Sequence, residues 1–167
     1  MGLENTSFAI YKNNCPVFSS SGSISGKIMT DVIAKYFGIS YEKAESYKHK
    51  VGLGSNVKER EEALEVLNPL LMSLSMEIER TVSFFEDNLI SKEGESIEKI
   101  VLCGGGANLK GLSSYLALTV HRPLVIANPW ENISFYKEIP PISLEEAQSY
   151  ITAIGLALRA LHYEDYN

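Results

Sequence analysis

The sequence has no long apolar run, only two cysteines and no excess of positive charge. None of its apolar stretches approaches the roughly 20 residues that a membrane-spanning helix needs. The start is polar and lacks a basic region, so we expect no signal peptide. The formal net charge of −6 disfavours nucleic acid and anionic membrane surfaces as partners. These absences favour a single cytoplasmic domain, which suits a chain of 167 residues.

The cysteines and histidines of the sequence predict neither a metal site nor a catalytic site. Cys15 and Cys103 each lie beside an apolar run, so we expect buried free thiols, with a disulfide as the open alternative. His49, His121 and His162 are far apart in sequence, so no metal site is expected. The sequence contains no paired carboxylates or Ser/His/Asp arrangement that we would select as catalytic.

Three consecutive glycines, Gly104 to Gly106, separate two apolar segments. Residues 97–103 are typical of a buried strand, and residues 109–120 are typical of a helix. Glycine can adopt positive φ and leaves the backbone bare, so a flat ligand can lie against such a turn at the carboxyl edge of a sheet. The turn therefore predicts a nucleotide surface, and the alternative is a strand-to-helix turn without a ligand.

Two familiar phosphate loops are excluded. The dinucleotide fingerprint needs glycine at its sixth position, which is Leu109 when counted from Gly104. Residues 22–28 look like a P-loop, but only three residues separate the glycines. Ile28 also replaces the Ser or Thr that would bind magnesium.

The first fifty residues predict a hairpin and two helices. Residues 8–11 and 16–20 flank Asn13-Asn14 and form the hairpin. A helix is expected at 27–37, closed by Gly38 in the left-handed conformation. Ser40 caps a second helix that runs to about residue 50.

The longest periodic pattern predicts an amphipathic helix after a flexible break at 51–55. Pro69 cannot donate a backbone hydrogen bond, so we expect a restart or a kink near Asn68. Packing against the chain's own sheet is favoured over a coiled coil, because the pattern is too short for one. Its apolar stripe consists of Leu64, Leu67, Leu71, Leu74, Ile78, Val82, Phe85 and Leu89.

The last third predicts a short strand at 123–127, an irregular loop at 128–141 and a final helix at 144–162. Ser143 begins this helix as its cap, with Glu146 completing a capping box. Gly155 lies inside this helix. We interpret it as the mark of a position where another backbone segment packs closely against the helix.

These elements predict one domain in four parts over residues 1–167. Residues 1–50 and 97–142 form a sheet core, and residues 51–96 form a small helical lobe. Residues 143–167 form a carboxyl-terminal helix.

Several stretches resemble, in order, the bacterial branch of the actin and heat-shock-chaperone ATPase fold. Residues 13–18 resemble the hairpin of its second phosphate loop, and residues 38–48 resemble its "ISxEEAExxK" helix. Residues 101–112 resemble its adenosine-binding motif. Residues 128–133 and 153–159 look like the type IV pilus assembly protein PilM rather than the division protein FtsA.

The resemblance implies an α/β fold, namely half of an actin-like ATPase fold with a ribonuclease H-like mixed sheet flanked by helices. Complete members are about twice as long and have two similar halves, and this chain resembles the second half. The first phosphate loop has no counterpart, and Met1 stands where the family has Asp before the glycine. We therefore expect an excised fragment rather than a truncated gene product.

The resemblance also implies an ATP or ADP site, with magnesium in the full-length protein and weak or no binding by this chain. Glu45 and Lys48 share one helix face and would lie beside the ribose and adenine, or form only a surface ion pair. The amides near Asn108 and Leu109 could contact an anion. The complete set of implied nucleotide-binding residues is Gly104, Gly105, Gly106, Ala107, Asn108, Glu45, Lys48, Gly2, Asn5, Thr6 and Gly26.

The evidence for the phosphate side is weaker. Gly2, Asn5, Thr6 and Ser7 match the second phosphate loop, but they would otherwise be only a frayed terminus. Lys27 replaces an acidic or amide residue of the family, which weakens the case for ribose or magnesium contacts at Gly26 and its neighbours. The water-activating carboxylate of the fold lies largely in the other half, so we expect no ATP hydrolysis by this chain.

By resemblance, the chain is part of a cytoplasmic scaffold of the type IV pilus or type II secretion platform. It would lie peripheral to the inner membrane and bind the cytoplasmic tail of a PilN-like partner, mostly through the other half. The alternatives are an FtsA-like division scaffold and an actin-fold sugar or acid kinase. We also expect self-association through the final helix.

Overall fold

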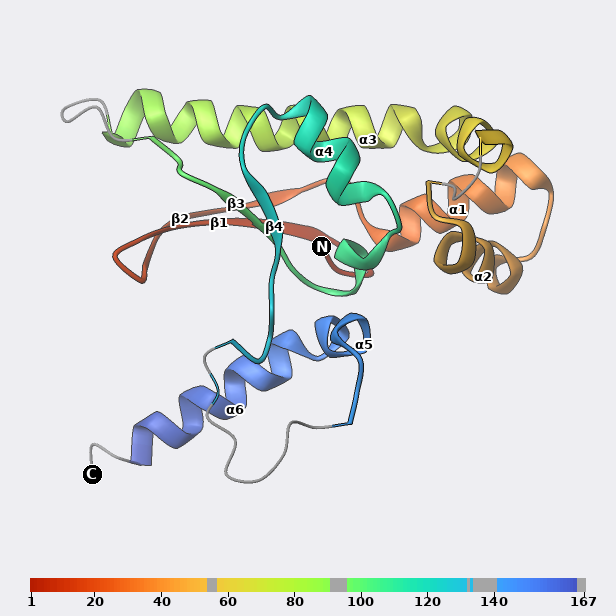
Figure 1. Cartoon of the computed structure of the whole chain (residues 1–167). Helices are drawn as coiled ribbons and strands as arrows, with labels where there is room; N and C mark the ends of the chain where they lie inside the picture. The colour runs from red at the N-terminus through yellow and green to blue at the C-terminus, as the bar shows by residue number, and fades with distance from the viewer. Residues whose placement is uncertain (54–56, 91–95, 132, 134–140, 165–167) are drawn as a thin grey trace.

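The computed structural model describes residues 1–53, 57–90, 96–131, 133 and 141–164 (Figure 1). Two short sheets lie among helices. The strands are β1 (Thr6–Lys12), β2 (Cys15–Gly22), β3 (Ile100–Leu102) and β4 (Leu124–Ile126). The helices are α1 (Gly26–Phe37), α2 (Tyr41–Val51), α3 (Val57–Phe85), η1 (Glu86–Ile90), η2 (Gly105–Asn108), α4 (Leu112–Thr119), α5 (Leu144–Ser149) and α6 (Ile151–Glu164).

The predicted hairpin is confirmed. β1 and β2 pair antiparallel, with Lys12 opposite Cys15. Asn13 and Asn14 have φ of 51° and 62°, which is the left-handed pair of a primed two-residue turn. Asn tolerates this region better than most residues, so the Asn-Asn dipeptide fixes the register of the hairpin.

β3 and β4 form a separate parallel pair, in which Ile100 lies opposite Leu124 and Leu102 opposite Ile126. The predicted strand at 97–103 was too long, because β3 begins only at Ile100. Ile97 is held by side chains instead. Its N–H donates to Glu86 Oε1 (2.9 Å), and its carbonyl accepts from the Arg122 guanidinium (3.0 Å).

Local capping determines the ends of α1 and α2, as predicted. Ser25 Oγ accepts from the N–H of Ile28 (3.3 Å), and Gly38 ends α1 with φ of 62°. Ser40 Oγ accepts from the N–H of Lys43 (3.5 Å) at the start of α2. Both serines satisfy amides that a helix leaves unpaired in its first turn.

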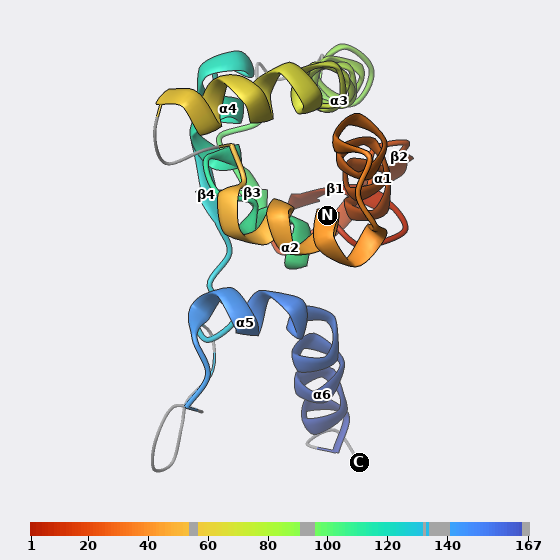
Figure 2. The same ribbon diagram turned by 90° about the vertical axis from the view of Figure 1, so that its right-hand side faces the viewer.

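α3 continues through Pro69, so the predicted restart is wrong. The ribbon nevertheless changes direction within its yellow part. The amino-terminal part is seen along its axis in Figure 1, and the longer remainder is seen along its axis in Figure 2, which confirms the predicted kink. Pro69 lies inside α3 and cannot donate a backbone hydrogen bond, which gives a physical cause for a kink. Of the preceding break, residues 54–56 lie outside the described ranges.

Most of the predicted stripe of α3 lies in the main apolar core, together with residues of α1, α2, β3 and α4. Its members in this core are Leu67, Leu71, Leu74, Ile78 and Val82, and Leu64 packs against them. Leu67, Leu71 and Leu74 are at most 1% exposed. On the other side of the core, Met29 and Ile33 of α1 and Leu112 and Leu116 of α4 are buried. The apolar face of α3 thus packs within its own chain, as predicted, and does not form a coiled coil.

The predicted final helix is interrupted. α5 ends at Ser149, and the N–H of Tyr150 donates to the carbonyl of Ala147 (3.0 Å) before α6 begins at Ile151. The predicted cap is confirmed, because Ser143 Oγ accepts from the N–H of Glu146 (3.1 Å). The predicted close approach at Gly155 is wrong within the described residues, because a Cβ added there would meet no atom within 4 Å.

The cysteine prediction was half right. Cys15 and Cys103 are both free, but both are exposed rather than buried. Cys15 begins the exposed strand β2, and Cys103 follows the last residue of β3. Within the described ranges, no helix combines the length and the hydropathy that crossing a membrane requires.

Candidate functional site

The glycine turn contains two short helical segments rather than one long helix. Gly104, with φ of 88°, leads from Cys103 into the 3-10 turn η2. Gly111, with φ of 81°, then caps α4, which begins at Leu112 and not at Leu109 as predicted. The left-handed glycine interrupts the helical pattern that the apolar spacing suggested.

The chain's own first residue lies against this turn. A Cβ on Gly104 would stand 2.5 Å from the Met1 carbonyl oxygen, and one on Gly106 would stand 2.8 Å from Met1 Cβ. These two glycines therefore make room for backbone, whatever else binds there. Gly105 is different, because its Cβ would meet only Ser149 Oγ, at 3.4 Å.

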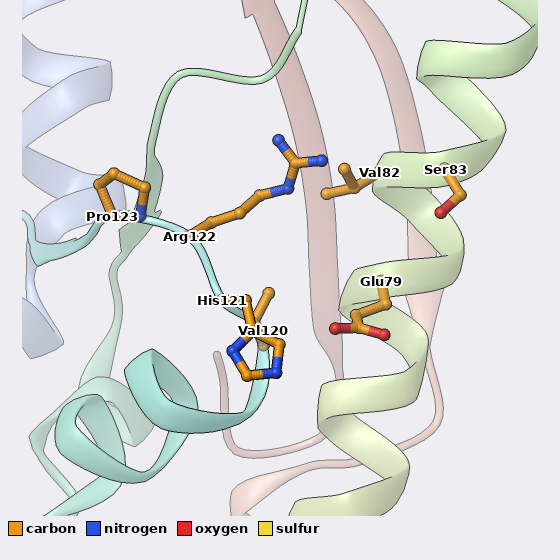
Figure 3. Close-up of a pocket in the computed structure, with 7 residues that line it drawn as sticks. All are labelled: Glu79, Val82, Ser83, Val120, His121, Arg122 and Pro123. Carbon is orange, nitrogen blue, oxygen red and sulfur yellow. The ribbon is translucent and has the colours of Figure 1, made fainter.

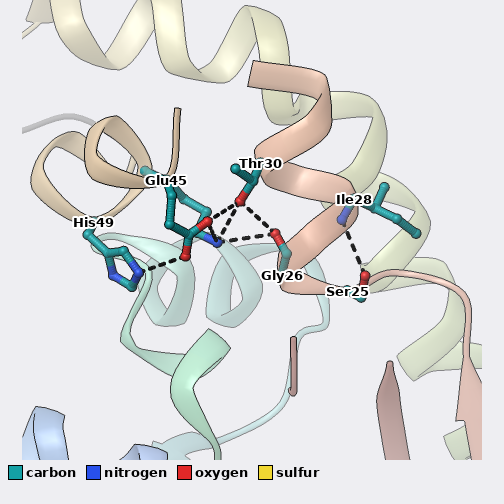
Figure 4. A network of polar contacts seen from close by, with 7 residues as sticks. Ser25, Gly26, Ile28, Thr30, Glu45 and His49 are labelled. Carbon is teal, nitrogen blue, oxygen red and sulfur yellow. Dashed lines mark hydrogen bonds and ion pairs between the residues drawn. The ribbon is translucent and has the colours of Figure 1, made fainter. Parts of the chain in front are cut away.

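A polar network joins α1 to α2 (Figure 4). Lys48 Nζ donates to the Gly26 carbonyl (3.1 Å), to Thr30 Oγ1 (2.8 Å) and to Glu45 Oε2 (2.8 Å). Thr30 Oγ1 also contacts Glu45 Oε2. His49 Nε2 lies 2.9 Å from the other carboxylate oxygen, Glu45 Oε1. Lys48 is only 8% exposed, so the Glu45–Lys48 pair is part of the fold and not a surface ion pair.

The network holds Glu45 in its ionised form. Burial by itself would raise the pKa of Glu45, but the hydrogen bonds from Lys48, Thr30 and His49 and the charge of Lys48 bring this pKa below its ordinary value. A carboxylate is thus present at neutral pH beside the glycine turn. Such a group accepts hydrogen bonds and cannot donate them.

These motifs converge on one pocket of about 150 Å³. Small-molecule sites usually measure about 300–1,000 Å³, so this pocket can enclose only part of a nucleotide. Six of the residues selected from the sequence line it, namely Gly2, Gly26, Glu45, Lys48, Gly105 and Gly106. They come from the amino-terminal turn, the start of α1, the face of α2 and the glycine turn.

The other five selected residues do not line this pocket. Gly104 packs against the backbone of Met1, and Ala107 is 1% exposed in the core. Asn108 Nδ2 donates to the Glu145 carbonyl (2.6 Å). The Asn5 carbonyl accepts from Gly2 N–H (2.9 Å), and Thr6 is buried.

The hydroxyl of Thr6 donates to the Ile24 carbonyl (2.5 Å), so it is committed to the fold. The anion contact expected at Asn108 and Leu109 assumed that a helix begins there. In the structure, the N–H of Leu109 donates to the Gly106 carbonyl (3.3 Å). In the described part of the chain, no three His, Cys, Asp or Glu residues gather as a metal site.

Four further residues line the pocket and were not selected from the sequence, namely Leu3, Met29, His49 and Leu109. His49 could have been found, because it follows Lys48 directly and lies four residues after Glu45 on the same helix face. The three apolar residues carry no such signal, since apolar side chains are common in both cores and pockets.

α5 packs against the back of the glycine turn. The Gly104 N–H donates to Gln148 Oε1 (3.2 Å), and Gln148 Nε2 donates to the Ala127 carbonyl. Gln148 is fully buried. It therefore ties the turn to the end of β4 and satisfies two backbone groups that the fold leaves without a ladder partner.

A larger pocket, of about 510 Å³, lies elsewhere, between α3 and the residues that connect α4 to β4 (Figure 3). Glu79 and Ser83 line it from α3, and His121 and Arg122 line it from the connection. Arg122 Nη2 is paired with Glu86 (2.8 Å), so its charge is already balanced. None of the selected residues lines this pocket, so its size alone does not make it the candidate site.

Comparison with solved structures defines the class of protein. One similar structure is titled "PilM-PilN type IV pilus biogenesis complex", with 31% identity over 95% of this chain and a TM-score of 0.78. Another is the ethanolamine utilization protein EutJ from Carboxydothermus hydrogenoformans, with 16% identity over 95% of this chain and a TM-score of 0.63. Both have the actin-like ATPase fold, so this chain has that fold.

The family model described as "Type IV pilus assembly protein PilM" matches residues 1–161. The chain therefore belongs to the PilM family. It covers 44% of the matched chain in the PilM–PilN complex and 46% of the EutJ chain, so it spans less than half of each.

Proposed function

We propose that this chain carries the adenosine side of an ATP or ADP site in a pilus-assembly protein. The observation that carries the proposal is the convergence of Gly2, Gly26, Glu45, Lys48 and the glycine turn on one pocket. These residues come from four separate stretches of the chain, and the fold brings them to the same pocket.

Within this proposal the residues have different roles. The bare backbone at Gly105 and Gly106 forms a surface against which the base lies. The ionised Glu45 accepts hydrogen bonds from ribose hydroxyls through the lone pair of Oε1 that His49 does not use, because Oε2 is committed to Lys48 and Thr30. Lys48 positions Glu45 and the start of α1. When bound, the nucleotide acts as a clamp, and its phosphates and magnesium are held mostly by groups outside this chain.

We further propose that the chain works as a scaffold on the cytoplasmic side of the inner membrane, in a type IV pilus or type II secretion platform. Its partner is the cytoplasmic tail of a PilN-like protein. Support comes from membership of the PilM family and from 31% identity to the PilM of a PilM–PilN complex. Fluorescence anisotropy with a labelled tail peptide tests this, and binding only by a longer family member would assign the groove to residues outside this chain.

Calorimetry with ADP and ATP tests the nucleotide site. We expect weak binding, with Kd above about 1 µM, because each absent charge-assisted hydrogen bond removes about 1.5–3 kcal/mol. Glu45→Gln should weaken it further, whereas Glu98→Gln, on an exposed residue outside the pocket, should not. Absence of heat at millimolar ADP both for this chain and for a longer family member would contradict the nucleotide proposal, and submicromolar affinity of this chain would contradict the partial site. ATP turnover would favour the kinase alternative.

A further inference from the structure

Two acidic side chains lie seven residues apart near the end of α3, and only one of them is paired. Glu79 belongs to α3, and Glu86 begins η1, which follows α3 directly. Seven residues are about two helical turns, so both side chains point to nearly the same face. Arg122 donates through Nη2 to the Glu86 carboxylate (2.8 Å) and through Nη1 to the Ile97 carbonyl (3.0 Å). In the described part of the chain, Glu79 has no such basic partner.

The pocket of about 510 Å³ lies in front of Glu79. Figure 3 shows the Glu79 carboxylate and the His121 ring on facing sides of this space. Val82 and Val120 give the pocket apolar walls and are only 7% and 4% exposed. A carboxylate beside apolar walls suits a long basic side chain, because its methylene stem packs against carbon while its charged head bonds the carboxylate.

Arg122 also lines this pocket, but it does not exclude a second cation. Its charge is balanced by Glu86, at 2.8 Å. A rise of 1.5 Å per residue separates Glu79 from Glu86 by about 10 Å, which is about the distance over which salt screens exposed charges. The Glu79 carboxylate therefore determines the sign of the charge that the pocket attracts. The formal net charge of −6 also favours a basic partner at longer range.

The backbone of His121 has an uncommon conformation at the edge of the pocket. Its φ is 50°, in the left-handed region that few residues other than glycine adopt. The chain turns here between α4 and β4 and brings Arg122 back towards α3. Glycine adopts this φ without cost, so a histidine at this position indicates a use for its ring. The ring forms the wall opposite Glu79.

We propose that this pocket binds an arginine side chain that a partner protein presents on an extended segment. The guanidinium donates to Glu79 as that of Arg122 donates to Glu86, and its stem packs against Val82 and Val120. A volume of about 510 Å³ also holds residues on either side of the arginine. No residue that lines this pocket lines the nucleotide pocket. The proposal therefore goes beyond the proposed function and does not rest on it.

Peptide titration followed by the NMR shifts of backbone amides gives the first test. The probe is the peptide Ser-Val-Arg-Val-Ser with blocked ends, and its matched control is Ser-Val-Gln-Val-Ser. We expect saturable shifts at Val82, Ser83 and His121 with the arginine peptide alone. Equal binding of the two peptides would overturn the proposal, as would no saturable shift up to about 10 mM. Nucleotide is left out, so this test can fail while the proposed function stands.

A pair of variants separates this pocket from general attraction between opposite charges. Glu79→Gln should keep the Tm, because Glu79 is exposed, and should bind the arginine peptide about fivefold to tenfold more weakly. Glu61→Gln makes the same change in net charge at an exposed position near the other end of α3 and should leave the affinity unchanged. An equal loss of affinity in both variants, or a loss in neither, would overturn the proposal.

Discussion

Lys48 Nζ and Glu45 Oε2 lie 2.8 Å apart in a position where both side chains are largely removed from solvent. The Lys48 ammonium also donates to the Gly26 carbonyl and to Thr30 Oγ1. All three of its protons therefore have acceptors within the protein. An ammonium group has no further donor. Lys48 is therefore a positioning residue, and the ligand-facing carboxylate depends on it.

Replacing Lys48 should weaken the fold itself. Lys48→Met removes three hydrogen bonds and leaves the Glu45 carboxylate without its counter-charge. The free energy of unfolding should fall by about 1.5–3 kcal/mol, the range for hydrogen bonds to charged groups. Urea denaturation measures the change. Lys43→Met, on the exposed side of the same helix, is the control and should be nearly neutral. Equal stability of the two variants would show that the network contributes nothing.

The stability of the chain should fall in acid through the same carboxylate. The folded-state pKa of Glu45 lies below its unfolded value, so the unfolded state binds more protons between the two. The stabilisation is fully present above the ordinary Glu pKa of about 4.3 and is lost as pH falls through the lower folded value. Unfolding curves from pH 7 to pH 3 should show a shallower acid loss for Glu45→Gln than for the wild type. Parallel pH profiles would contradict this prediction.

Gly105 offers a test of the nucleotide surface that spares the fold. Gly105→Val should abolish adenosine binding in a complete protein, because its methyl groups fill the space beside the turn. The fold should survive, since a Cβ there meets only Ser149 Oγ, at 3.4 Å. Calorimetry and thermal melting measure the two effects separately. Gly104→Ala is the contrasting variant and should destabilise, because its Cβ would overlap the Met1 carbonyl and φ is 88°. Normal ATP binding by the valine variant would mean that Gly105 serves only the turn.

The elements predicted correctly from the sequence are those determined by neighbouring residues. The Asn13-Asn14 turn, the Ser40 cap and the Gly38 end each depend on residues within four positions, and all three are present. Such local signals act before tertiary contacts form. For the same reason the amphipathic stripe of α3 predicted its buried face, although continuation of the helix through Pro69 was missed.

The errors have long-range causes. β3 begins late because Glu86 and Arg122 bind the backbone of Ile97, and neither contact is visible in the local pattern. The hydrogen bond from Met1 to the Cys103 carbonyl joins residues 102 positions apart. The glycine motif predicted an uncovered backbone, but only the structure shows that Met1 packs against part of that backbone.

The site was partly predictable. The glycine turn and the Glu45 helix were recognised as two motifs, and the fold brings them to one pocket. The commitment of Lys48 to Gly26 and Thr30 was not predictable, because helix spacing gives the face of a side chain but not its tertiary partner. Thr6 was misplaced for the same reason, since its hydroxyl bonds the Ile24 carbonyl.

Tyr47 carries a polar group that the core does not use. In the described part of the chain its buried hydroxyl has no hydrogen-bond partner. Burial, together with the charges of Glu62 and Glu59, raises the pKa of Tyr47, so the group stays neutral. Tyr47→Phe should therefore raise the free energy of unfolding by about 1 kcal/mol, since an unsatisfied buried group costs about 1–3 kcal/mol. Tyr11→Phe, at a position that is 64% exposed, is the control. A loss of stability in Tyr47→Phe would reveal a partner, such as ordered water.

α6 leaves apolar side chains without cover. It extends away from the rest of the molecule in Figure 1, and Leu156 is 62% exposed. Ile151, Ile154 and Leu158 are half-buried on the same helix. The spacing of Ile151, Ile154 and Leu158 puts these three side chains on one face of α6, and large contiguous apolar patches on monomers promote association. We therefore expect the isolated chain to self-associate, as a dimer that shares or exchanges this helix.

Sedimentation equilibrium measures the association. The chain should sediment above 18.5 kDa at high concentration. Ile151→Glu with Leu158→Glu should return it to a monomer without a change in circular dichroism, because neither side chain belongs to the main core. Leu118→Glu is the matched control, since Leu118 is 71% exposed on α4, away from this helix. A wild-type chain that stays monomeric at high concentration would rule the dimer out, and dissociation by Leu118→Glu would place the interface on α4 instead.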